Sequence, residues 1–127
     1  MNALATFDKH KVVYRPHEDI EIAFGKNKAG NDHIIDHYKE KIEGVSYWLH
    51  LCNESSAHAI IWFKGSINLQ KQQKINAFKF VKSMLTEKKD DDVIFCLLSG
   101  VEKTSKVGEV KTKNEKNMSD SSWSDSL

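Results

Sequence analysis

The stretch that most constrains the fold is residues 45–64, in which two apolar runs flank a short polar break. The first run, residues 45–52, reads Val-Ser-Tyr-Trp-Leu-His-Leu-Cys, and the second, residues 57–64, reads Ala-His-Ala-Ile-Ile-Trp-Phe-Lys. Aromatic and β-branched residues favour strands, and the Asn-Glu-Ser-Ser sequence between the runs has the composition of a hairpin connection. The sequence therefore predicts a β-hairpin against which the remainder of the chain packs.

Three further segments have strand character. Residues 20–24 alternate apolar and other side chains with a period of two, which predicts a strand with one face towards a core. Residues 10–15 form a shorter run that ends at Pro16, as expected for an edge strand. Residues 93–98 are continuously apolar, as in a strand that is covered on both faces or is central in its sheet.

Two segments have the periodicity of helices. The first is predicted over residues 32–43, with Asn31 or Asp32 as its N-cap. The second is predicted over residues 67–88, where Ser66 is a suitable N-cap and apolar residues recur along one face. Each helix therefore offers an apolar stripe that can pack on a sheet.

From residue 18 onward the predicted order is strand, helix, strand, strand, helix, strand. With right-handed crossovers this order gives the ferredoxin-like βαββαβ fold, an α+β fold in which an antiparallel sheet carries two helices on one face. Residues 10–15 would add an extra N-terminal edge strand. The predicted domain spans residues 1–101, because Lys, Ser, Asn, Glu and Asp dominate from residue 102 onward. That composition predicts a disordered polar C-terminal tail over residues 102–127.

Length and composition bound the class of protein. A chain of 127 residues is long enough for one core and too short for two ordinary domains. No apolar run approaches the roughly 20 residues that cross a bilayer, and the first residues lack the pattern of a signal peptide. Cys52 and Cys96 lie in apolar runs and are too few for a disulfide framework, so both are expected as buried thiols. These features predict an intracellular, cytoplasmic protein with no membrane partner.

If helices cover only one face of the sheet, the other face presents every second residue of the hairpin to water, and a contiguous apolar surface of this kind commonly binds protein. Depending on register, the exposed set is Trp48, His50 and Cys52 or Tyr47, Leu49 and Leu51. The alternatives are that the N-terminal segment or the tail covers this face, or that it stacks single-stranded bases. The prediction is a partner protein, with a homodimer as one form. The residues predicted to bind it are Tyr47, Trp48, His50, His58, Trp62 and Trp123.

Trp123 belongs to the last residues of the tail, 118–127, which read Met-Ser-Asp-Ser-Ser-Trp-Ser-Asp-Ser-Leu. One Trp and one Leu among Ser and Asp are typical of a short linear motif that folds on a partner, and phosphorylation would add negative charge to it. The alternative is an inert solubilising end.

The net charge of +1 conceals a basic helix. Residues 66–89 contain six lysines and one acidic residue, whereas residues 90–101 contain three acidic residues and no lysine. Lysines along one helix can contact phosphates with little sequence preference, so nucleic-acid binding is the alternative function. Arg15 is the only arginine, which argues against specific base readout. The residues assigned to this alternative are Lys71, Lys74, Lys79 and Lys82.

The sequence carries no signature of a cofactor site or of nucleophilic catalysis, so no cofactor and no catalytic residue are predicted. His33 and His37 lie four residues apart on a predicted helix, but two ligands do not make a metal site, and exposed polar positions explain them better. An enzyme of this sequence would use His50 or His58 as a general base. We therefore expect a non-enzymatic protein without a bound metal.

Residues 20–100 loosely resemble the dimeric origin-binding domains of papillomavirus regulatory proteins, in which a Trp-bearing strand precedes an Ala-Ile-Val-type strand and a Gln-rich helix. The matching features here are Trp48, Ala-Ile-Ile at residues 59–61 and Gln-Lys-Gln-Gln at residues 70–73. The resemblance implies a dimer that reads DNA with the helix at residues 32–43, where this chain carries four acidic residues instead of a basic face. The residues themselves predict a small regulator or inhibitor that binds protein through its apolar sheet face and tail.

Overall fold

The structure, a computed structural model, describes residues 4–52, 54–65 and 69–127. The helices are α1 (Lys28–Lys39) and α2 (Lys71–Leu85), with one short 3-10 helix, η1 (Leu98–Gly100). The strands are β1 (Leu4–Phe7), β2 (Lys11–His17), β3 (Ile20–Gly25), β4 (Val45–Leu51), β5 (Ala59–Phe63), β6 (Val93–Leu97), β7 (Val101–Lys103), β8 (Val110–Thr112) and β9 (Lys116–Asn117).

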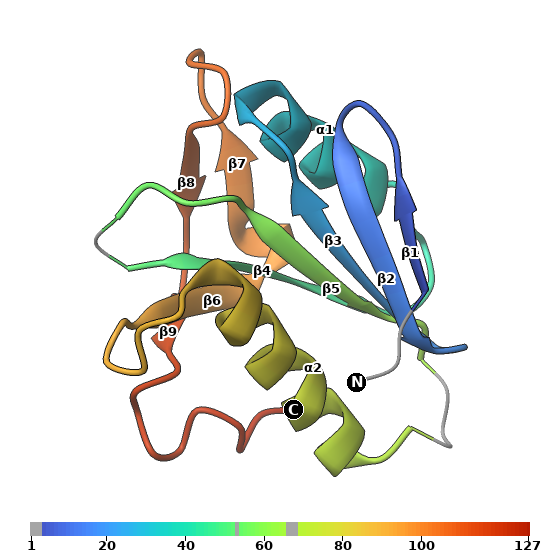
Figure 1. The fold of residues 1–127 in the computed structure, drawn as a ribbon, viewed down its shortest axis with the longest axis vertical. Helices are drawn as coiled ribbons and strands as arrows, with labels where there is room; N and C mark the ends of the chain where they lie inside the picture. Colours follow the sequence, from blue (N-terminus) through green and yellow to red (C-terminus); the bar gives the residue numbers. More distant parts are fainter. Residues whose placement is uncertain (1–3, 53, 66–68) are drawn as a thin grey trace.

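Seven of these strands form one sheet in the order β1-β2-β3-β5-β4-β6-β9, and neighbouring strands are antiparallel (Figure 1). The predicted hairpin is β4–β5, in which Leu49 pairs with Ala59 and Val45 with Phe63. Strands β7 and β8 pair with each other outside this sheet. The prediction of a mixed fold of helices and a mostly antiparallel sheet is confirmed.

The strand order differs from the predicted ferredoxin-like one. In a ferredoxin-like sheet the last strand lies beside the first strand of the βαββαβ unit, which here is β3. Strand β6 instead lies beside β4. The reason is local, because β2 turns directly into β3, with His17 opposite Ile20, and occupies the outer edge of β3. The only edge of the four-strand unit left for β6 is that of β4.

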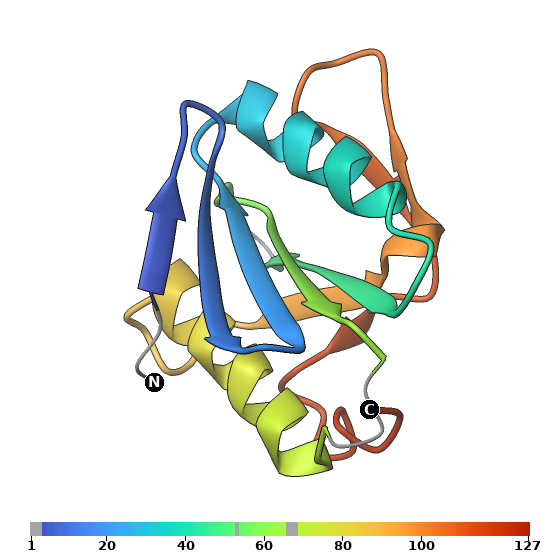
Figure 2. The ribbon, with the colours of Figure 1, turned by 90° about the vertical axis from the view of Figure 1, so that its right-hand side faces the viewer.

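This order also places the helices on opposite faces of the sheet, not on one face as predicted. The segments β3–α1–β4 and β5–α2–β6 each skip one strand, and both step across the sheet in the same direction. Because β3 and β5 are antiparallel, two crossovers of the favoured hand must pass over opposite faces. Figure 2 shows α1 and α2 on either side of the sheet.

Each helix closes its own apolar core. The core on the α1 face contains Val13, Ala23, Ile34, Ile35, Tyr38, Trp48, Ile60, Trp62, Cys96, Leu98 and Val101. The core on the α2 face is larger and includes Ile20, Ile22, Phe24, Leu49, Leu51, Ala59, Ile61, Phe63, Leu69, Ala77, Phe78, Val81, Val93, Phe95 and Met118. Strand β5 is buried along its whole length because it faces both cores.

Helix α1 begins four residues earlier than predicted. Asn27 is its N-cap, and the Asn27 side chain accepts a hydrogen bond from the amide of Gly30 at 2.8 Å. Gly30 lies in the first turn against the carbonyl oxygen of His10, which a Cβ atom at this position would approach to 2.1 Å. Glycine therefore lets α1 pack closely on the β1–β2 turn.

Helix α2 begins at Lys71 instead of residue 67. Its N-cap is Gln70, which forms a capping box with Gln73. The predicted N-cap, Ser66, lies outside the described residues. Neither helix in the described part of the chain combines the length and the apolar character that a membrane span requires.

Residues 102–127 are not the disordered tail that their composition predicts. The β7–β8 ribbon lies against α1, where Lys103 Nζ is 2.7 Å from Asp36 Oδ2 and the Gly108 amide donates to Asp32 Oδ1 at 3.0 Å. Further along, β9 pairs with β6 and the Met118 amide donates to the carbonyl of Val93 at 2.9 Å. Composition averages over the segment, whereas a few apolar side chains placed against the cores are sufficient to fix its path.

Candidate functional site

The sheet face that the sequence predicts as an exposed binding surface is covered. Trp48, His58 and Trp62 are only 3%, 5% and 7% exposed. Both of the alternative residue sets on β4 point towards a helix, since Trp48 belongs to the core under α1 and Leu49 and Leu51 to the core under α2. The prediction of a bare apolar sheet face is therefore wrong, because the two crossovers cover both faces.

Three of the predicted residues meet on the α1 face. Trp48 Nε1 donates to His58 Nδ1 at 3.2 Å, and the His58 amide donates to Asn31 Oδ1 at 3.1 Å. The ring of the half-buried His50 lies 5.0 Å from that of His58. Burial, and then the neighbouring His50, lowers the pKa of His58 to about 4. His58 is thus a neutral imidazole that accepts the buried indole N–H, which is a structural role.

Trp62 lies elsewhere on the same face, where its Nε1 donates to the carbonyl of Glu43 at 3.0 Å and Lys41 Nζ is 4.7 Å from its ring. Tyr47 and Trp123 are on the α2 face instead. The Tyr47 ring is 5.2 Å from that of Phe78, and burial raises the pKa of its hydroxyl. The predicted protein-binding set is therefore divided between two cores and forms no common surface.

The histidine pair on α1 lies beside a lysine of β2. His33 Nε2 is 3.2 Å from Lys11 Nζ, and its ring stacks on that of His10 at 4.6 Å. Burial and then Lys11 lower the pKa of His33, and burial likewise lowers that of His37. The described residues contain no cluster of three or more His, Cys, Asp or Glu side chains with metal-binding geometry.

The two cysteines differ. Cys96 is buried as predicted, and burial followed by the charge of Glu115 raises its pKa to about 11. Cys52 is exposed, contrary to the prediction. It lies one residue beyond the end of β4, where the chain leaves the sheet.

The four lysines of α2 do not share one face. At about 100° per residue, Lys71, Lys79 and Lys82 fall within roughly 80° of one another around the helix. Lys74 lies on the sheet side, where its Nζ is 5.8 Å from the Phe63 ring. No Asp or Glu occurs between residues 71 and 85, so no carboxylate of α2 offsets the charge of its lysines.

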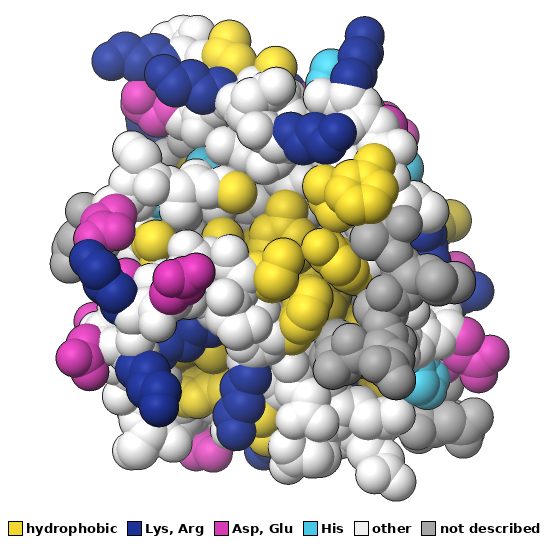
Figure 3. Space-filling view, in the orientation of Figure 1, with side chains coloured by type: hydrophobic (Ala, Val, Ile, Leu, Met, Phe, Trp, Pro, Cys, Tyr) yellow, Lys and Arg dark blue, Asp and Glu magenta, His cyan; other side chains and the backbone are white. Residues whose placement is uncertain are grey.

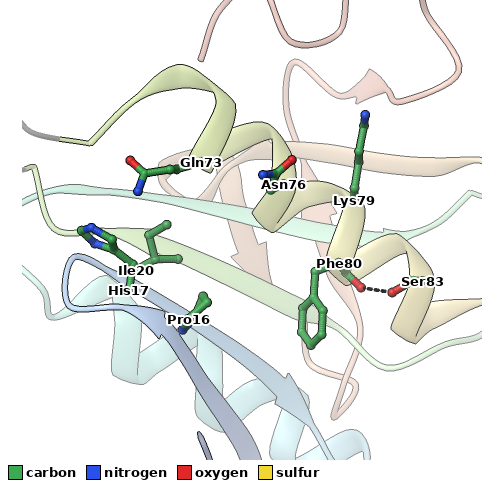
Figure 4. Close-up of a pocket in the computed structure, with 8 residues that line it drawn as sticks. All are labelled: Pro16, His17, Ile20, Gln73, Asn76, Lys79, Phe80 and Ser83. Atoms are coloured by element: carbon green, nitrogen blue, oxygen red, sulfur yellow. Dashed lines mark hydrogen bonds between the residues drawn. The ribbon is translucent and has the colours of Figure 1, made fainter. Parts of the chain in front are cut away.

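A cleft of about 580 Å³ runs between α2 and the β2–β3 turn (Figure 4). Five of its side chains come from α2 and three from the turn. They are Gln73, Asn76, Lys79, Phe80 and Ser83, and Pro16, His17 and Ile20.

Polar and apolar side chains both line this cleft. Ser83 Oγ donates to the Phe80 carbonyl at 2.7 Å, and His17 Nδ1 accepts from the Asp19 amide at 3.0 Å. Gln73 Oε1 accepts from the Gln70 amide at 2.8 Å and Asn76 Oδ1 accepts from Gln72 Nε2 at 2.9 Å, so the two side chains offer mainly their NH2 groups as donors. No Asp or Glu is among the described residues that line the cleft. Phe80 contacts Tyr14 at a ring distance of 5.2 Å, and Figure 3 shows apolar side chains gathered beside α2 on this face.

Sequence reasoning identified Lys79 but missed Gln73 and Asn76. A detectable signal was present, because Gln72, Gln73 and Asn76 are uncharged polar residues on a helix whose other polar positions are mostly lysine. Pro16, His17 and Ile20 precede the helix by more than fifty positions, so only the fold brings the two parts together.

Comparisons with known proteins identify a fold and no family. No protein-family model matches the sequence, and no curated protein matches it. Among solved structures, the chain is similar to the C-terminal part of the fibronectin/fibrinogen-binding protein from Streptococcus suis, with a TM-score of 0.61 and 18% identity. The match covers 91% of this chain and 46% of the other, so this chain spans about half the length of that structure. At this identity the similarity concerns the fold alone.

Proposed function

We propose that the chain is a protein-binding module that holds an extended, acidic segment of a partner protein in the cleft between α2 and the β2–β3 turn. The observation that carries this proposal is the composition of the cleft. Its cationic lining residue is Lys79, and no Asp or Glu is among its described lining residues to repel an acidic chain. The Asp19 carboxylate lies outside this lining, 3.9 Å from His17 Nδ1, so the positive charge of the cleft comes from the α2 side.

The cleft has the groups that a peptide requires. The side-chain NH2 groups of Gln73 and Asn76, whose oxygens already accept bonds within α2, can donate to the carbonyls of a peptide backbone, and Phe80 offers an apolar contact for an anchoring side chain. Lys79 would pair with a partner carboxylate. A volume of about 580 Å³ lies within the usual range of ligand clefts.

The fold comparison is compatible with a protein partner. The similar structure belongs to a protein named for binding fibronectin and fibrinogen, which are themselves proteins. This comparison supports only the class of partner, a protein. The acidic character of the bound segment is inferred from the residues that line the cleft.

Matched charge reversals on one helix test the proposal. Random peptides displayed on phage are selected on the immobilised full chain, and enriched peptides are measured by fluorescence anisotropy. We expect enriched sequences to combine Asp or Glu with an aliphatic or aromatic residue. Lys79→Glu should weaken their binding about tenfold, whereas Lys71→Glu, outside the cleft, should change it less than about twofold. No enrichment, or equal effects of the two variants, would contradict the proposal.

Nucleic-acid binding is the second candidate, favoured by one observation, the four lysines and no acidic residue of α2. A labelled single-stranded RNA added to the same assay separates the two. Phosphate contacts predict that Lys71→Glu and Lys79→Glu weaken binding equally and that affinity falls steeply with salt. Tight RNA binding with this pattern, in the absence of peptide binding, would assign the function to nucleic acid.

A further inference from the structure

Residues 119–127 are attached to the domain almost entirely by side chains. The last described backbone hydrogen bond from this end of the chain to the sheet is that of Met118 to Val93. Beyond it, the amides of Asp120, Trp123, Asp125 and Leu127 donate to carbonyls three residues earlier, and only the first of these acceptors, Asn117, belongs to a strand, β9. A segment with this pattern can leave the domain without breaking a sheet or helix.

Trp123 is the main anchor of this segment. Its ring lies 5.3 Å from that of Phe78 and 5.9 Å from that of Phe95, and Leu127 packs on the same core. Phe78 and Phe95 are 0% and 1% exposed with the segment in place. Removing the segment would uncover part of both rings, so an apolar groove lies beneath it.

The groove continues beyond the segment. A cleft of about 300 Å³ on one side is lined by Tyr47, Phe95 and Ser126, among others, and one of about 210 Å³ on the other side by Tyr47, Phe63 and Leu127, among others. Tyr47 and Ser126 line both. The segment therefore fills only part of a larger apolar recess, which has room for additional side chains.

The charges of the groove and of residues 119–127 are opposite in sign. The charged side chains that line the two clefts are those of Lys74, Lys113 and Lys116, and no Asp or Glu is among their described lining residues. Residues 119–127 carry Asp120 and Asp125 and no cation, and neither aspartate forms an ion pair with a described residue. The segment is held at this end by a bond from Lys116 Nζ to Ser126 Oγ at 3.0 Å.

We propose that this groove is a docking site for an acidic peptide segment with an aromatic anchor on another protein, and that residues 119–127 are a built-in, exchangeable occupant that competes with it. The groove lies along Lys74 and Phe78, on the opposite flank of α2 from the cleft lined by Asn76 and Lys79. It is therefore a second site, and its test is independent of the first.

The probe is a fluorescein-labelled peptide with the sequence of residues 119–127, titrated into the full-length chain and followed by anisotropy. Trp123→Ala removes the anchor of the competing segment. We expect this variant to bind the peptide at least about tenfold more tightly than the unchanged chain, because a tethered competitor acts at millimolar effective concentration. A peptide with Trp replaced by Ala should not bind, and Lys74→Glu combined with Trp123→Ala should weaken binding. Lys79→Glu combined with Trp123→Ala should not.

Hydrogen exchange on the unchanged chain provides a second measurement that needs no variant. The amides of residues 119–127 should exchange well before the amide of Met118, because the segment opens while the sheet remains closed. Equal protection of the segment and the sheet would show that the segment is a permanent part of the core and would overturn the proposal. So would absence of peptide binding to a folded Trp123→Ala variant, equal binding to both chains, or displacement of the peptide by single-stranded RNA.

Discussion

Each face of the sheet is covered by one helix, but hydrogen bonds between buried polar atoms are prominent on one face and contacts between aromatic rings on the other. On the α1 face, buried polar atoms are paired, as in the bonds from Trp48 to His58, from Trp62 to the Glu43 carbonyl and from Tyr38 Oη to Glu21 at 3.2 Å. On the α2 face the contacts are between rings, with Phe78 near Tyr47, Phe63, Phe95 and Trp123.

This difference indicates how each face should respond to change. An aromatic core loses stability when volume is removed and is insensitive to pH, since it contains no buried titratable group with a physiological pKa. A core with paired polar atoms loses stability when one partner is removed or takes up a proton. The four predictions below compare the faces in these terms.

Phe78→Ala should have the largest effect. Phe78 is fully buried among four aromatic rings, and loss of a buried Phe side chain typically costs about 3–5 kcal/mol of unfolding free energy. Urea denaturation followed by far-UV circular dichroism measures this loss. Met84→Ala on the same helix, where the side chain is half exposed, is the control and should cost less than about 1 kcal/mol. A loss of less than about 1 kcal/mol for Phe78→Ala would show that the Phe78 ring does not fill the core on the α2 face.

Acid should destabilise the protein through the α1 face. Well above pH 6.5, the ordinary pKa of histidine, His58 is neutral in both the folded and the unfolded chain and adds little pH dependence. As the pH falls, the unfolded chain is protonated first, while the folded pKa of about 4 keeps the buried imidazole neutral. The unfolding free energy should therefore fall by about 2 kcal/mol between pH 7 and pH 5.

His58→Gln is the control for that measurement, because it retains an acceptor for the Trp48 indole and does not titrate. Urea midpoints at the two pH values should differ much less in this variant. His33 and His37, whose pKa values burial also lowers, should leave a smaller slope of the same sign. An unchanged slope would assign the acid sensitivity to another group.

Trp48→Phe and Trp123→Phe compare the same substitution on the two faces. The first leaves the buried Nδ1 of His58 without its donor and should cost about 1–2 kcal/mol. Trp123 Nε1 makes no hydrogen bond with a described residue, so its substitution should cost less than about 1 kcal/mol. Thermal denaturation of the two variants measures the difference, and equal losses would remove the distinction drawn between the faces.

The smallest effect is expected on the surface of the α1 side. Lys103 pairs with Asp36 at 2.7 Å and so joins the β7–β8 ribbon to α1, but both side chains are partly exposed. Lys103→Met should cost less than about 1 kcal/mol, and the loss should shrink in high salt. A larger cost that is independent of salt would mean that the ribbon depends on this pair.

The sequence predicted the elements better than their arrangement. The alternation at residues 20–24 and the apolar runs at 45–64 and 93–98 correspond to β3, β4, β5 and β6. The strand order could not be read from them, because it depends on β2 occupying the edge of β3. For the same reason, the pattern of β4 could not show that its second face is covered.

The candidate site was predicted only in part. A run of lysines on a helix is visible in a sequence, so Lys79 was identified. The amides of Gln73 and Asn76 carry no charge, so their only signal in the sequence was that of uncharged polar residues on a lysine-rich helix, and the facing turn at Pro16 and His17 is distant in sequence. Trp123 was predicted to bind another protein, whereas in the structure its ring lies on Phe78 and Phe95 of its own chain.

The position of β5 between β3 and β4 has a consequence for how the molecule assembles. The β3–α1–β4 unit contains no direct strand pairing of its own, since both strands pair with β5, which is synthesised later. The β5–α2–β6 unit likewise contains no direct pairing between its two strands, since both pair with β4. Each crossover thus completes the other, so neither half can form a stable intermediate alone, and the four central strands should fold and unfold in one cooperative step.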